Sequence, residues 1–384
     1  MRYVTAGESH GRALTAIVSD VPAGVPIEHR TIDADLARRQ TGYGRGGRMM
    51  IEQDRAIISS GVRFGHTIGS PVTLTILNRD WDNWTDIMQV APSSTASPAK
   101  VTAPRPGHAD LPGLLKTGST DIRDVLERAS ARETAARVGA GAVARAFLQE
   151  LGVEVFSFVA SVGAVRMGLV PDYESLDPAE IEESDLRCPD TEASALMRAA
   201  IDEAAAAGES LGGTFVVFAT GLVPGLGGYA QADSRLDAKL AAAIISVPAI
   251  KGVEFGDGFA LAAVTGSLAH DEIFHNQARG YHRLTNHAGG LEGGMTNGET
   301  LVVRAAMKPI PTLMTPLASV DIETLKPVDA CKERSDVCAV PAAAVVAEAE
   351  VAMVLAAAYM KSFGSSNLSD IQCALEAYRQ RIVR

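Results

Sequence analysis

The stretch from Arg38 to Met49 constrains this chain most strongly, because it reads Arg-Arg-Gln-Thr-Gly-Tyr-Gly-Arg-Gly-Gly-Arg-Met in a protein of formal net charge −11. Glycine lets the backbone adopt positive φ and approach a ligand closely, and guanidinium groups present rigid donor forks that match pairs of phosphate oxygens. Two more arginine-bearing segments lie at residues 105–110 and 128–133. We therefore hypothesise that the fold brings the three segments and His10 together around one pocket for a multiply anionic ligand.

The composition is that of a globular protein with a large core. The 384 residues allow one large domain or two ordinary ones, and 47% of them are apolar. The acidic charge disfavours binding to nucleic acid or to anionic membranes, because such proteins use wide basic surfaces. The longest apolar stretch, residues 337–360, contains Glu348 and Glu350, which predicts a buried helix rather than a membrane span. The four cysteines form no CxxC pair, so we expect a reduced cytoplasmic protein without a disulfide or a metal site.

Apolar periodicity and turn residues predict alternating strands and helices. Arg128 and Arg132, four residues apart in one predicted long helix, should share a face. Three segments without periodicity are expected to be loops: residues 81–100, 104–120 and the glycine-rich 282–298. Strands are expected at 11–20, 55–61, 70–77 and 153–166. Helices are expected at 31–40 with Thr31 as N-cap, at 121–151 and at 231–246. An alanine-rich helix should end at about residue 207, and a C-terminal helix should begin at about residue 341.

Short sequence patterns that occur twice in the chain predict two related halves. A strand ending in Val-Pro-Ala-Gly at residues 21–24 has a counterpart ending in Val-Pro-Gly at 223–225. A Thr-x-Gly sequence before a strand occurs at Thr67 and again at Thr296. We interpret this as a duplication that gives two similar α/β halves in one body, with the ligand site between them.

Individual motifs leave the chemistry open. The glycines at 42–47 are a weak dinucleotide fingerprint, since a helix rather than a strand precedes them. His10 and His108 stand among glycines and short polar residues, where sites gather, but no histidine has the spacing of metal ligands. Ser9 and Ser130 lack a nucleophile-elbow sequence and are expected to donate hydrogen bonds to a phosphate or a cofactor. Asp336 is equally interpretable as a helix-start acid and as a proton acceptor. These residues indicate a cytosolic enzyme with an anionic, phosphorylated substrate, without naming the reaction.

The chain resembles the chorismate synthase family at eight segments that lie in the family's order along nearly the whole sequence. They are Gly7-Glu-Ser-His-Gly11, Arg38 to Arg48, Arg105-Pro-Gly-His-Ala-Asp110, Arg128-Ala-Ser-Ala-Arg-Glu-Thr134, Gly252-Val-Glu-Phe-Gly-Asp-Gly258, Asn286-His-Ala-Gly-Gly290, Lys308-Pro309 and Arg334-Ser-Asp336.

The resemblance implies an α+β fold: a β-α-β sandwich built from two related halves, with helices packed outside the central sheets. It implies one domain over residues 1–384, with halves at roughly 1–150 and 151–340 followed by a C-terminal helix and tail, and a homotetramer. It also implies the 1,4-elimination of phosphate from 5-enolpyruvylshikimate 3-phosphate to give chorismate. Reduced FMN would assist by supplying an electron transiently, without net redox change.

The resemblance also implies residue roles. His10 would protonate the departing phosphate, His108 would lie by the flavin, and Asp336 would take up the proton lost from the ring. Positions matching substrate contacts are Ser9, Arg39, Arg45, Arg48, Arg105 and Arg132. Positions matching FMN contacts are Arg128, Ala129, Ser130, Pro248, Ala249, Gly293, Lys308, Pro309, Ile310, Pro311, Thr312 and Arg334. Arg39 and Arg45 also match positions assigned to NADP contact, so NADPH is a candidate reductant, although we expect dependence on cellular reductants.

Two other readings compete with this one. An FMN-dependent oxidoreductase or flavin reductase would explain the flavin loops but not five arginines for a substrate. A non-catalytic RNA-binding module would explain the Gly/Arg loop, but the acidic charge and the scarcity of aromatic residues for base stacking argue against it.

Overall fold

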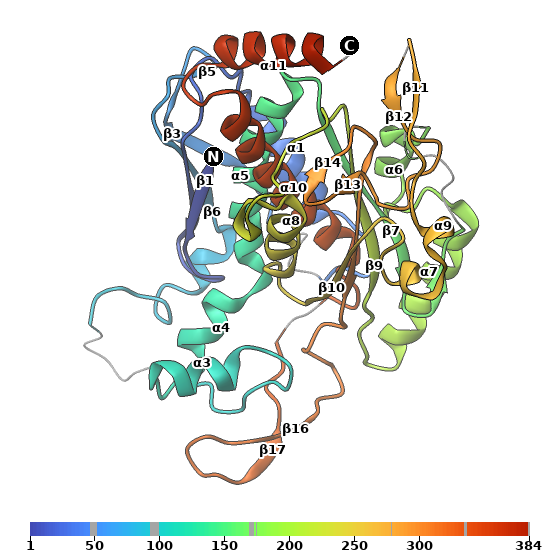
Figure 1. Cartoon of the computed structure of the whole chain (residues 1–384). Helices are drawn as coiled ribbons and strands as arrows, with labels where there is room; N and C mark the ends of the chain where they lie inside the picture. The colour runs from blue at the N-terminus through green and yellow to red at the C-terminus, as the bar shows by residue number, and fades with distance from the viewer. Residues whose placement is uncertain are drawn as a thin grey trace.

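The computed structural model describes residues 1–46, 52–92, 100–168, 173, 175–277, 279–333 and 336–382. Its core has two antiparallel sheets with helices between them (Figure 1). Arg48 and Arg334 of the predicted site lie outside the described residues.

The first sheet comes from the N-terminal part of the chain. Along β2, Leu14, Ala16 and Val18 are buried while the residues between them are more exposed, which is the period of a half-buried strand. In spatial order the strands are β1 (Arg2–Ala6), β2 (Ala13–Ser19), β6 (Val72–Leu77) and β3 (Ala56–Ser60).

The second sheet has five strands and is covered on both faces over much of its length. Phe215 and Val217 of β9 face the main core, while Val216 and Phe218 belong to a second apolar cluster on the other face. In spatial order the strands are β10 (Ile250–Phe255), β15 (Leu301–Met307), β9 (Gly213–Thr220), β7 (Glu154–Val162) and β8 (Val165–Arg166).

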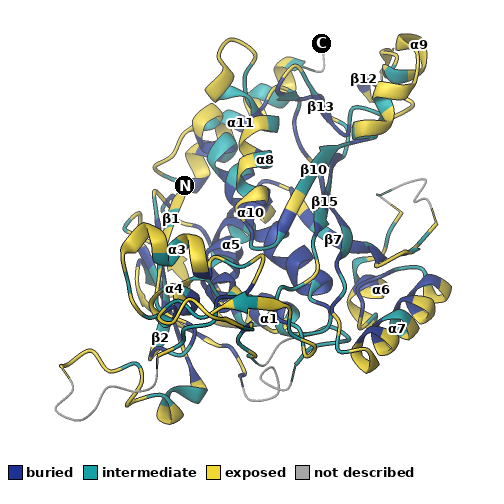
Figure 2. Ribbon diagram, turned by 90° about the horizontal axis from the view of Figure 1, so that it is seen from below, coloured by how far each residue is buried: buried dark blue, intermediate teal, exposed yellow. Residues whose placement is uncertain are grey.

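Helices α5 (Thr134–Gln149) and α10 (Val340–Phe363) form the layer between the sheets. Helix α5 packs on β2 and β6, α10 packs on β7 and β9, and the two helices pack on each other. Both are mostly buried, whereas exposed helices lie at the periphery (Figure 2). The prediction that helices pack outside the central sheets is therefore wrong for α5 and α10. Helix α10 is long and apolar enough to cross a membrane, but 89% of its apolar window is buried inside the protein, as in the core helix of a soluble protein.

Glycine at position 141 lets these two helices approach closely. A Cβ added to Gly141 would lie 2.2 Å from Ala349 Cβ and 2.5 Å from Ala349 Cα. We therefore expect Gly141→Ala to destabilise the protein by about 1–3 kcal/mol through overpacking, despite the better helix propensity of alanine. Urea unfolding measures this. Gly139→Ala is the matched control, because its added Cβ would come no closer than 3.3 Å, to the end of the Leu74 side chain. Equal stability of Gly141→Ala and the parent chain would contradict the close packing.

The predicted long helix over 121–151 is broken. Ser130 has extended backbone (φ −65°, ψ 144°) and separates α4 (Arg123–Ala129) from η2 (Ala131–Glu133) and α5. The Ser130 side chain accepts a hydrogen bond from the backbone of Arg132, so the break is a helix start with its own cap. Because of this break, Arg128 and Arg132 do not share a helix face as predicted.

Two further expectations differ from the structure. Part of the predicted loop at 104–120 is helical, since α3 spans Asp110–Thr117. Helix α1 (His29–Gln40) begins two residues before Thr31, so Thr31 is not its N-cap. The remaining helices are α6 (Pro178–Glu183), α7 (Thr191–Ala206), α8 (Leu236–Ile245), α9 (Gly266–Ala269) and α11 (Leu368–Ile382), with 3-10 turns η1 (Arg79–Asn83), η3 (Ala232–Ser234) and η4 (Gly258–Ala263). The short hairpins are β4 (Val62–Arg63) with β5 (His66–Thr67), β11 (Phe274–Asn276) with β12 (Gly280–His282), β13 (Leu291–Glu292) with β14 (Met295–Thr296), and β16 (Ala318–Val320) with β17 (Pro327–Asp329).

The two Thr-x-Gly sequences make the same contacts. Thr67 Oγ1 donates to Pro22 O and accepts from Val25 N, at 2.5 and 2.9 Å. Thr296 Oγ1 donates to Val223 O and accepts from Leu226 N, at 2.7 and 2.9 Å. Each threonine thus fixes the turn that follows a central strand, one turn for each sheet.

Candidate active site

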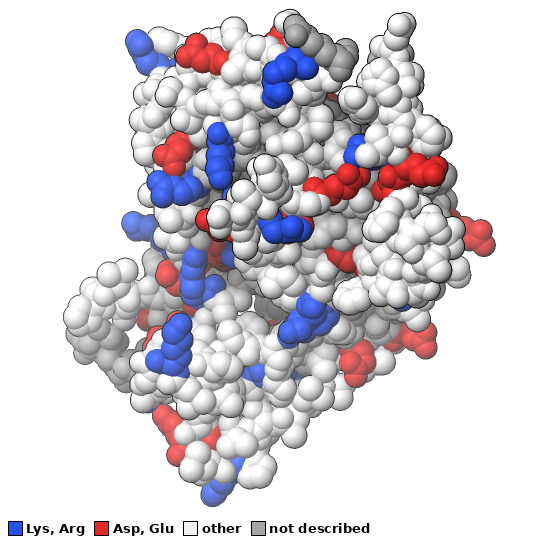
Figure 3. Space-filling model, in the orientation of Figure 1, with Lys and Arg blue, Asp and Glu red and all other residues white. Residues whose placement is uncertain are grey.

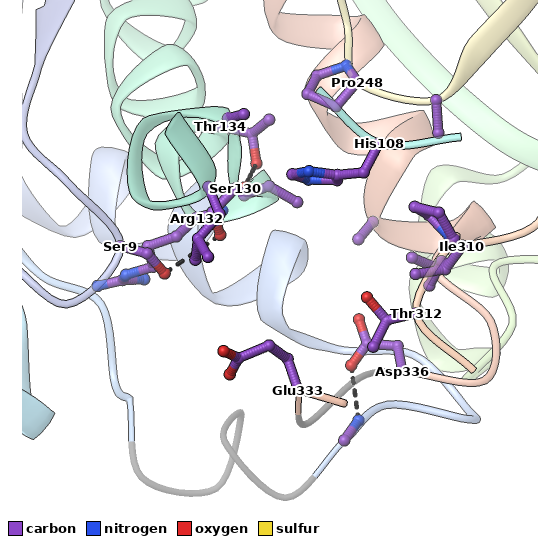
Figure 4. Close-up of a pocket in the computed structure, with 18 of the residues that line it drawn as sticks. Ser9, His108, Ser130, Arg132, Thr134, Pro248, Ile310, Thr312, Glu333 and Asp336 are labelled. Atoms are coloured by element: carbon purple, nitrogen blue, oxygen red, sulfur yellow. Dashed lines mark hydrogen bonds between the residues drawn. The ribbon is translucent and has the colours of Figure 1, made fainter. Parts of the chain in front are cut away.

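A cavity of about 850 Å³ lies beside α10, where the arginine-bearing segments meet (Figure 4). Helix α10 contributes small apolar residues to its wall, and the loops around it contribute polar ones. His108 and Pro248 lie on one side of the space, with Glu333 and Asp336 opposite (Figure 4). The predicted site residues that line it are Ser9, His10, Arg39, Arg45, Arg105, His108, Ala129, Ser130, Arg132, Pro248, Ala249, Lys308, Ile310, Pro311, Thr312 and Asp336.

Three predicted residues with described positions do not line this cavity: Arg128, Gly293 and Pro309. Because of the helix break at Ser130, the half-exposed Arg128 side chain turns to the first sheet, where it donates to Thr5 and to Gly7 O. Gly293 occupies the turn between β13 and β14, where its φ of +58° favours glycine for a backbone reason. Only the neighbours of Pro309 reach the cavity wall.

Arg39 and Arg132 form the buried cationic end of the cavity. Arg132 Nη1 donates to Asp54 Oδ2 at 2.7 Å, and Arg39 Nη1 lies 3.5 Å from the same oxygen. Arg39 Nε donates to Thr134 Oγ1 at 2.9 Å. Burial and the neighbouring Arg132 charge lower the pKa of the Arg39 guanidinium, which Asp54 opposes, and the group stays charged at neutral pH.

These two guanidinium groups have donor capacity left over. Among the described residues, Arg39 Nη1 and Arg132 Nη2 are buried and have no hydrogen-bond acceptor, although each lies near a carboxylate. Buried donors without acceptors cost free energy unless a ligand accepts from them. A phosphate or carboxylate group that reached these two nitrogens would satisfy both.

His108 and Arg105 share one buried carboxylate. His108 Nδ1 lies 2.5 Å from Asp110 Oδ1, and Arg105 Nε donates to Asp110 Oδ2 at 2.8 Å. Arg105 Nη2 also lies 3.1 Å from His108 Nδ1, but the shorter contact favours a proton on Nδ1 that is donated to Asp110. Burial raises the pKa of Asp110, but the hydrogen bonds from His108 and Arg105 outweigh it and leave that pKa well below the usual range. Asp110 is therefore ionised at all physiological pH values.

Asp336 joins two segments at the cavity that lie far apart in the sequence. Its carboxylate accepts from Gly46 N at 2.6 Å and pairs with Arg45 Nη1 at 2.9 Å. The glycine-rich segment thus meets the segment before α10, as predicted. Arg38 of the same segment turns away from the cavity to Glu348 in the core.

Sequence reasoning missed several residues at the site. Trp84 lies in the segment predicted to be a polar loop, yet its ring stacks on His10 with centroids 3.7 Å apart. Glu127 binds His10, and Glu333 and Thr134 line the cavity. The available signal was the pair Trp81 and Trp84 in an otherwise polar stretch, because large aromatic residues usually pack against other side chains.

The family model of chorismate synthase matches residues 1–360. The chain belongs to the chorismate synthase family. It is 57% identical over 380 residues to a protein from Moorella thermoacetica named chorismate synthase, covering 99% of this chain and 98% of that one. A chorismate synthase from Desulforamulus reducens is 53% identical over 381 residues, with coverage of 99% and 98%. A solved structure titled "Crystal Structure of Chorismate Synthase" superposes with a TM-score of 0.81 at 41% identity, covering 100% of this chain and 98% of that one.

The predicted family and activity are therefore confirmed. The protein is a chorismate synthase-type lyase of the shikimate pathway, which serves aromatic amino-acid biosynthesis, and the flavin reductase reading is not favoured. Basic and acidic side chains are interspersed on the face of the molecule in Figure 3. Among the described residues, no group of three or more His, Cys, Asp or Glu side chains is placed to hold a metal ion.

Proposed function

We propose that the 850 Å³ cavity binds reduced FMN and 5-enolpyruvylshikimate 3-phosphate together. The observation that carries this is the convergence of five cationic side chains and two histidines from distant segments on one cavity. The five are Arg39, Arg45, Arg105, Arg132 and Lys308. The volume lies in the upper part of the range of about 300–1,000 Å³ found for small-molecule sites. The substrate carries a phosphate and two carboxylates, and these anionic groups match the cationic side chains that line the cavity.

The residues fit a flavin. Ala342, Ala343 and Val346 of α10 give a flat apolar wall, and Val247 and Pro248 add to it, which suits an aromatic ring system. Lys308 Nζ donates to Gly107 O and so stands next to the His108 loop, where its charge suits an anionic group. When bound, reduced FMN would supply an electron transiently and regain it, so that the elimination has no net redox change. The residues proposed to hold it are Ala129, Ser130, Pro248, Ala249, Lys308, Ile310, Pro311 and Thr312, together with Arg128, Gly293, Pro309 and Arg334 from the family resemblance alone.

Arg39 and Arg132 are proposed to bind the leaving phosphate. Negative charge grows on that group as its bond to the ring breaks, and fixed cations stabilise growing charge without reorganising. Their two donors without an acceptor support this assignment. Ser9, Arg45 and Arg105 are proposed to bind the rest of the anionic substrate, and Arg48 is added from the resemblance.

Two histidines and one carboxylate are proposed to handle protons. His10 would donate one to the departing phosphate, which an imidazolium does readily near neutral pH. His108, held by Asp110, would keep a positive charge beside the flavin. Asp336, which pairs with Arg45 and accepts a hydrogen bond from Gly46 N, would accept the proton lost from the substrate ring.

We also propose that the chain is one domain of two related halves. The strand order β1-β2-β6-β3 matches β7-β9-β15-β10, and the matching threonine contacts of Thr67 and Thr296 support common descent of the halves. A homotetramer in the cytoplasm, with flavin reduced by cellular reductants rather than by its own use of NADPH, completes the proposal.

An anaerobic assay tests the proposed function. Protein, photoreduced FMN and 5-enolpyruvylshikimate 3-phosphate are mixed, and phosphate, chorismate and the flavin spectrum are followed. We expect one phosphate per chorismate, with the flavin still reduced at the end. Equal turnover with oxidised FMN, or phosphate release with stoichiometric flavin oxidation, would reject the cofactor role.

A further inference from the structure

His10 is held at two points by one carboxylate. Glu127 Oε2 accepts from the His10 backbone N–H at 2.9 Å, and Glu127 Oε1 lies 2.9 Å from Nδ1 of the ring. Because one rigid carboxylate contacts both backbone and ring, it limits where the ring can turn. The opposite edge of the ring carries Nε2.

The ring is also held across its face. Trp84 stacks on it with an interplanar angle of 20°. The Arg123 guanidinium lies over the Trp84 ring, 5.3 Å from the ring centroid, and donates to Glu127 Oε1 at 3.1 Å. Trp84 Nε1 in turn donates to Asp80 Oδ2 at 3.0 Å. In the described part of the chain, the charged groups in contact with His10 or with its stacking partner Trp84 include Glu127 and Arg123 of α4 and Asp80 of η1.

Glu127 is ionised where it lies. Its side chain is 2% exposed, and burial raises its pKa, but the hydrogen bonds and charge of His10 and the charge of Arg123 outweigh this and lower the pKa below the usual range. An ionised carboxylate only accepts hydrogen bonds, so the His10 ring must carry a proton on Nδ1. The contact between His108 and buried Asp110 has the same form, which gives both cavity histidines a carboxylate behind Nδ1.

We propose that Glu127 is the positioning residue of His10: its buried carboxylate keeps a proton on Nδ1 and so directs Nε2, the proton-donating atom, toward the cavity. This inference rests on the proposed role of His10. The Glu127 charge stabilises the doubly protonated ring before the proton leaves. After it leaves, the same carboxylate holds the remaining proton on Nδ1, so that Nε2 is ready to be protonated again.

The proposal is tested by ¹⁵N NMR of the full protein labelled at its histidine rings, with His10→Ala identifying the His10 signals. At a pH where the ring is neutral, we expect the proton of His10 to be on Nδ1. Glu127→Gln should abolish the exclusive Nδ1–H form and lower kcat by about 10²-fold with KM unchanged. Glu350→Gln is the matched control, because Glu350 is also buried and bonded, to Tyr3 and Arg137, but does not line the cavity. It should leave the His10 proton on Nδ1.

A proton on Nε2 of His10 in the unchanged protein would overturn the proposal, even if Glu127→Gln fails to fold. So would a folded Glu127→Gln protein with kcat equal to that of the parent. A wrong assignment of His10 in the proposed function would give a different result. In that case the His10→Ala protein itself would retain full kcat, whatever the position of the ring proton.

Discussion

Replacing either cavity histidine with alanine should lower kcat by about 10²–10⁴-fold, the usual contribution of a positioned proton donor or acceptor. His10 and His108 line one cavity and are each held through Nδ1 by a buried carboxylate. Under the proposed roles, removal of His10 takes away the proton donor for the departing phosphate, and removal of His108 takes away the side chain proposed to lie beside the flavin. Anaerobic phosphate release at saturating substrate measures kcat.

The matched control is His275→Ala. His275 is exposed on β11 and does not line the cavity, so kcat should stay at the parent value. Circular dichroism and the sedimentation of all three variants separate a chemical loss from a structural one. If His10→Ala or His108→Ala lost its folded assembly along with its activity, that histidine would be structural and its assigned role wrong.

The largest effect on stability is expected at Glu348 in the middle of α10. Its carboxylate accepts from Arg38 Nη1 and Nη2, both at 2.8 Å, and from Arg187 Nη2 at 3.0 Å. Ser157 Oγ donates to it at 2.6 Å. Glu348→Gln removes the negative charge between buried guanidinium groups, so we expect unfolding to become easier by about 3–5 kcal/mol. Urea unfolding measures this loss.

Glu323→Gln is the control for a charge pair at the surface. Glu323 and its partner Lys100 are half exposed, so the loss should stay below about 1 kcal/mol. A Glu348→Gln protein as stable as this control would show that the buried network contributes nothing.

The same network makes stability depend on acid. Burial raises the pKa of Glu348, but Arg38, Arg187 and Arg145 outweigh it and lower that pKa to about 2 from the ordinary value of 4.5 for a glutamate. A carboxyl whose pKa is lower in the folded state contributes stability above its unfolded pKa and loses it as pH falls toward the folded value. We therefore expect the parent chain to lose stability between about pH 4.5 and 2 more steeply than Glu348→Gln, as urea midpoints at several pH values would measure. Parallel curves would contradict this.

The sequence predicted many of the residues that line the cavity, because they belong to short segments with distinctive composition. Only the family resemblance placed Arg45 and Asp336 in one site. Local sequence patterns say nothing about contacts between residues almost three hundred positions apart. The helix break at Ser130 was not predicted, because residues 121–151 contain no proline and are mostly good helix formers, and the break depends on one serine cap. That one turn decides which arginine, 128 or 132, reaches the cavity.

The sequence also did not predict which helices lie between the two sheets. Helices α5 and α10 are apolar nearly all round, a pattern that indicates burial but does not say between which elements. Arg38 illustrates the same limit, for its neighbour Arg39 lines the cavity while Arg38 pairs with Glu348 in the core. Adjacent residues of a helix point in different directions, but their spacing does not say which of them meets the ligand.

The central claim is that one cavity beside α10 binds both the flavin and the substrate, with cations from distant segments around them. A crystal structure of the protein with reduced FMN and 5-enolpyruvylshikimate 3-phosphate tests it most directly. The account predicts both molecules inside this cavity, with a substrate anion accepting hydrogen bonds from Arg39 and Arg132. Flavin bound elsewhere, or a substrate that leaves both guanidinium groups without an acceptor, would contradict it.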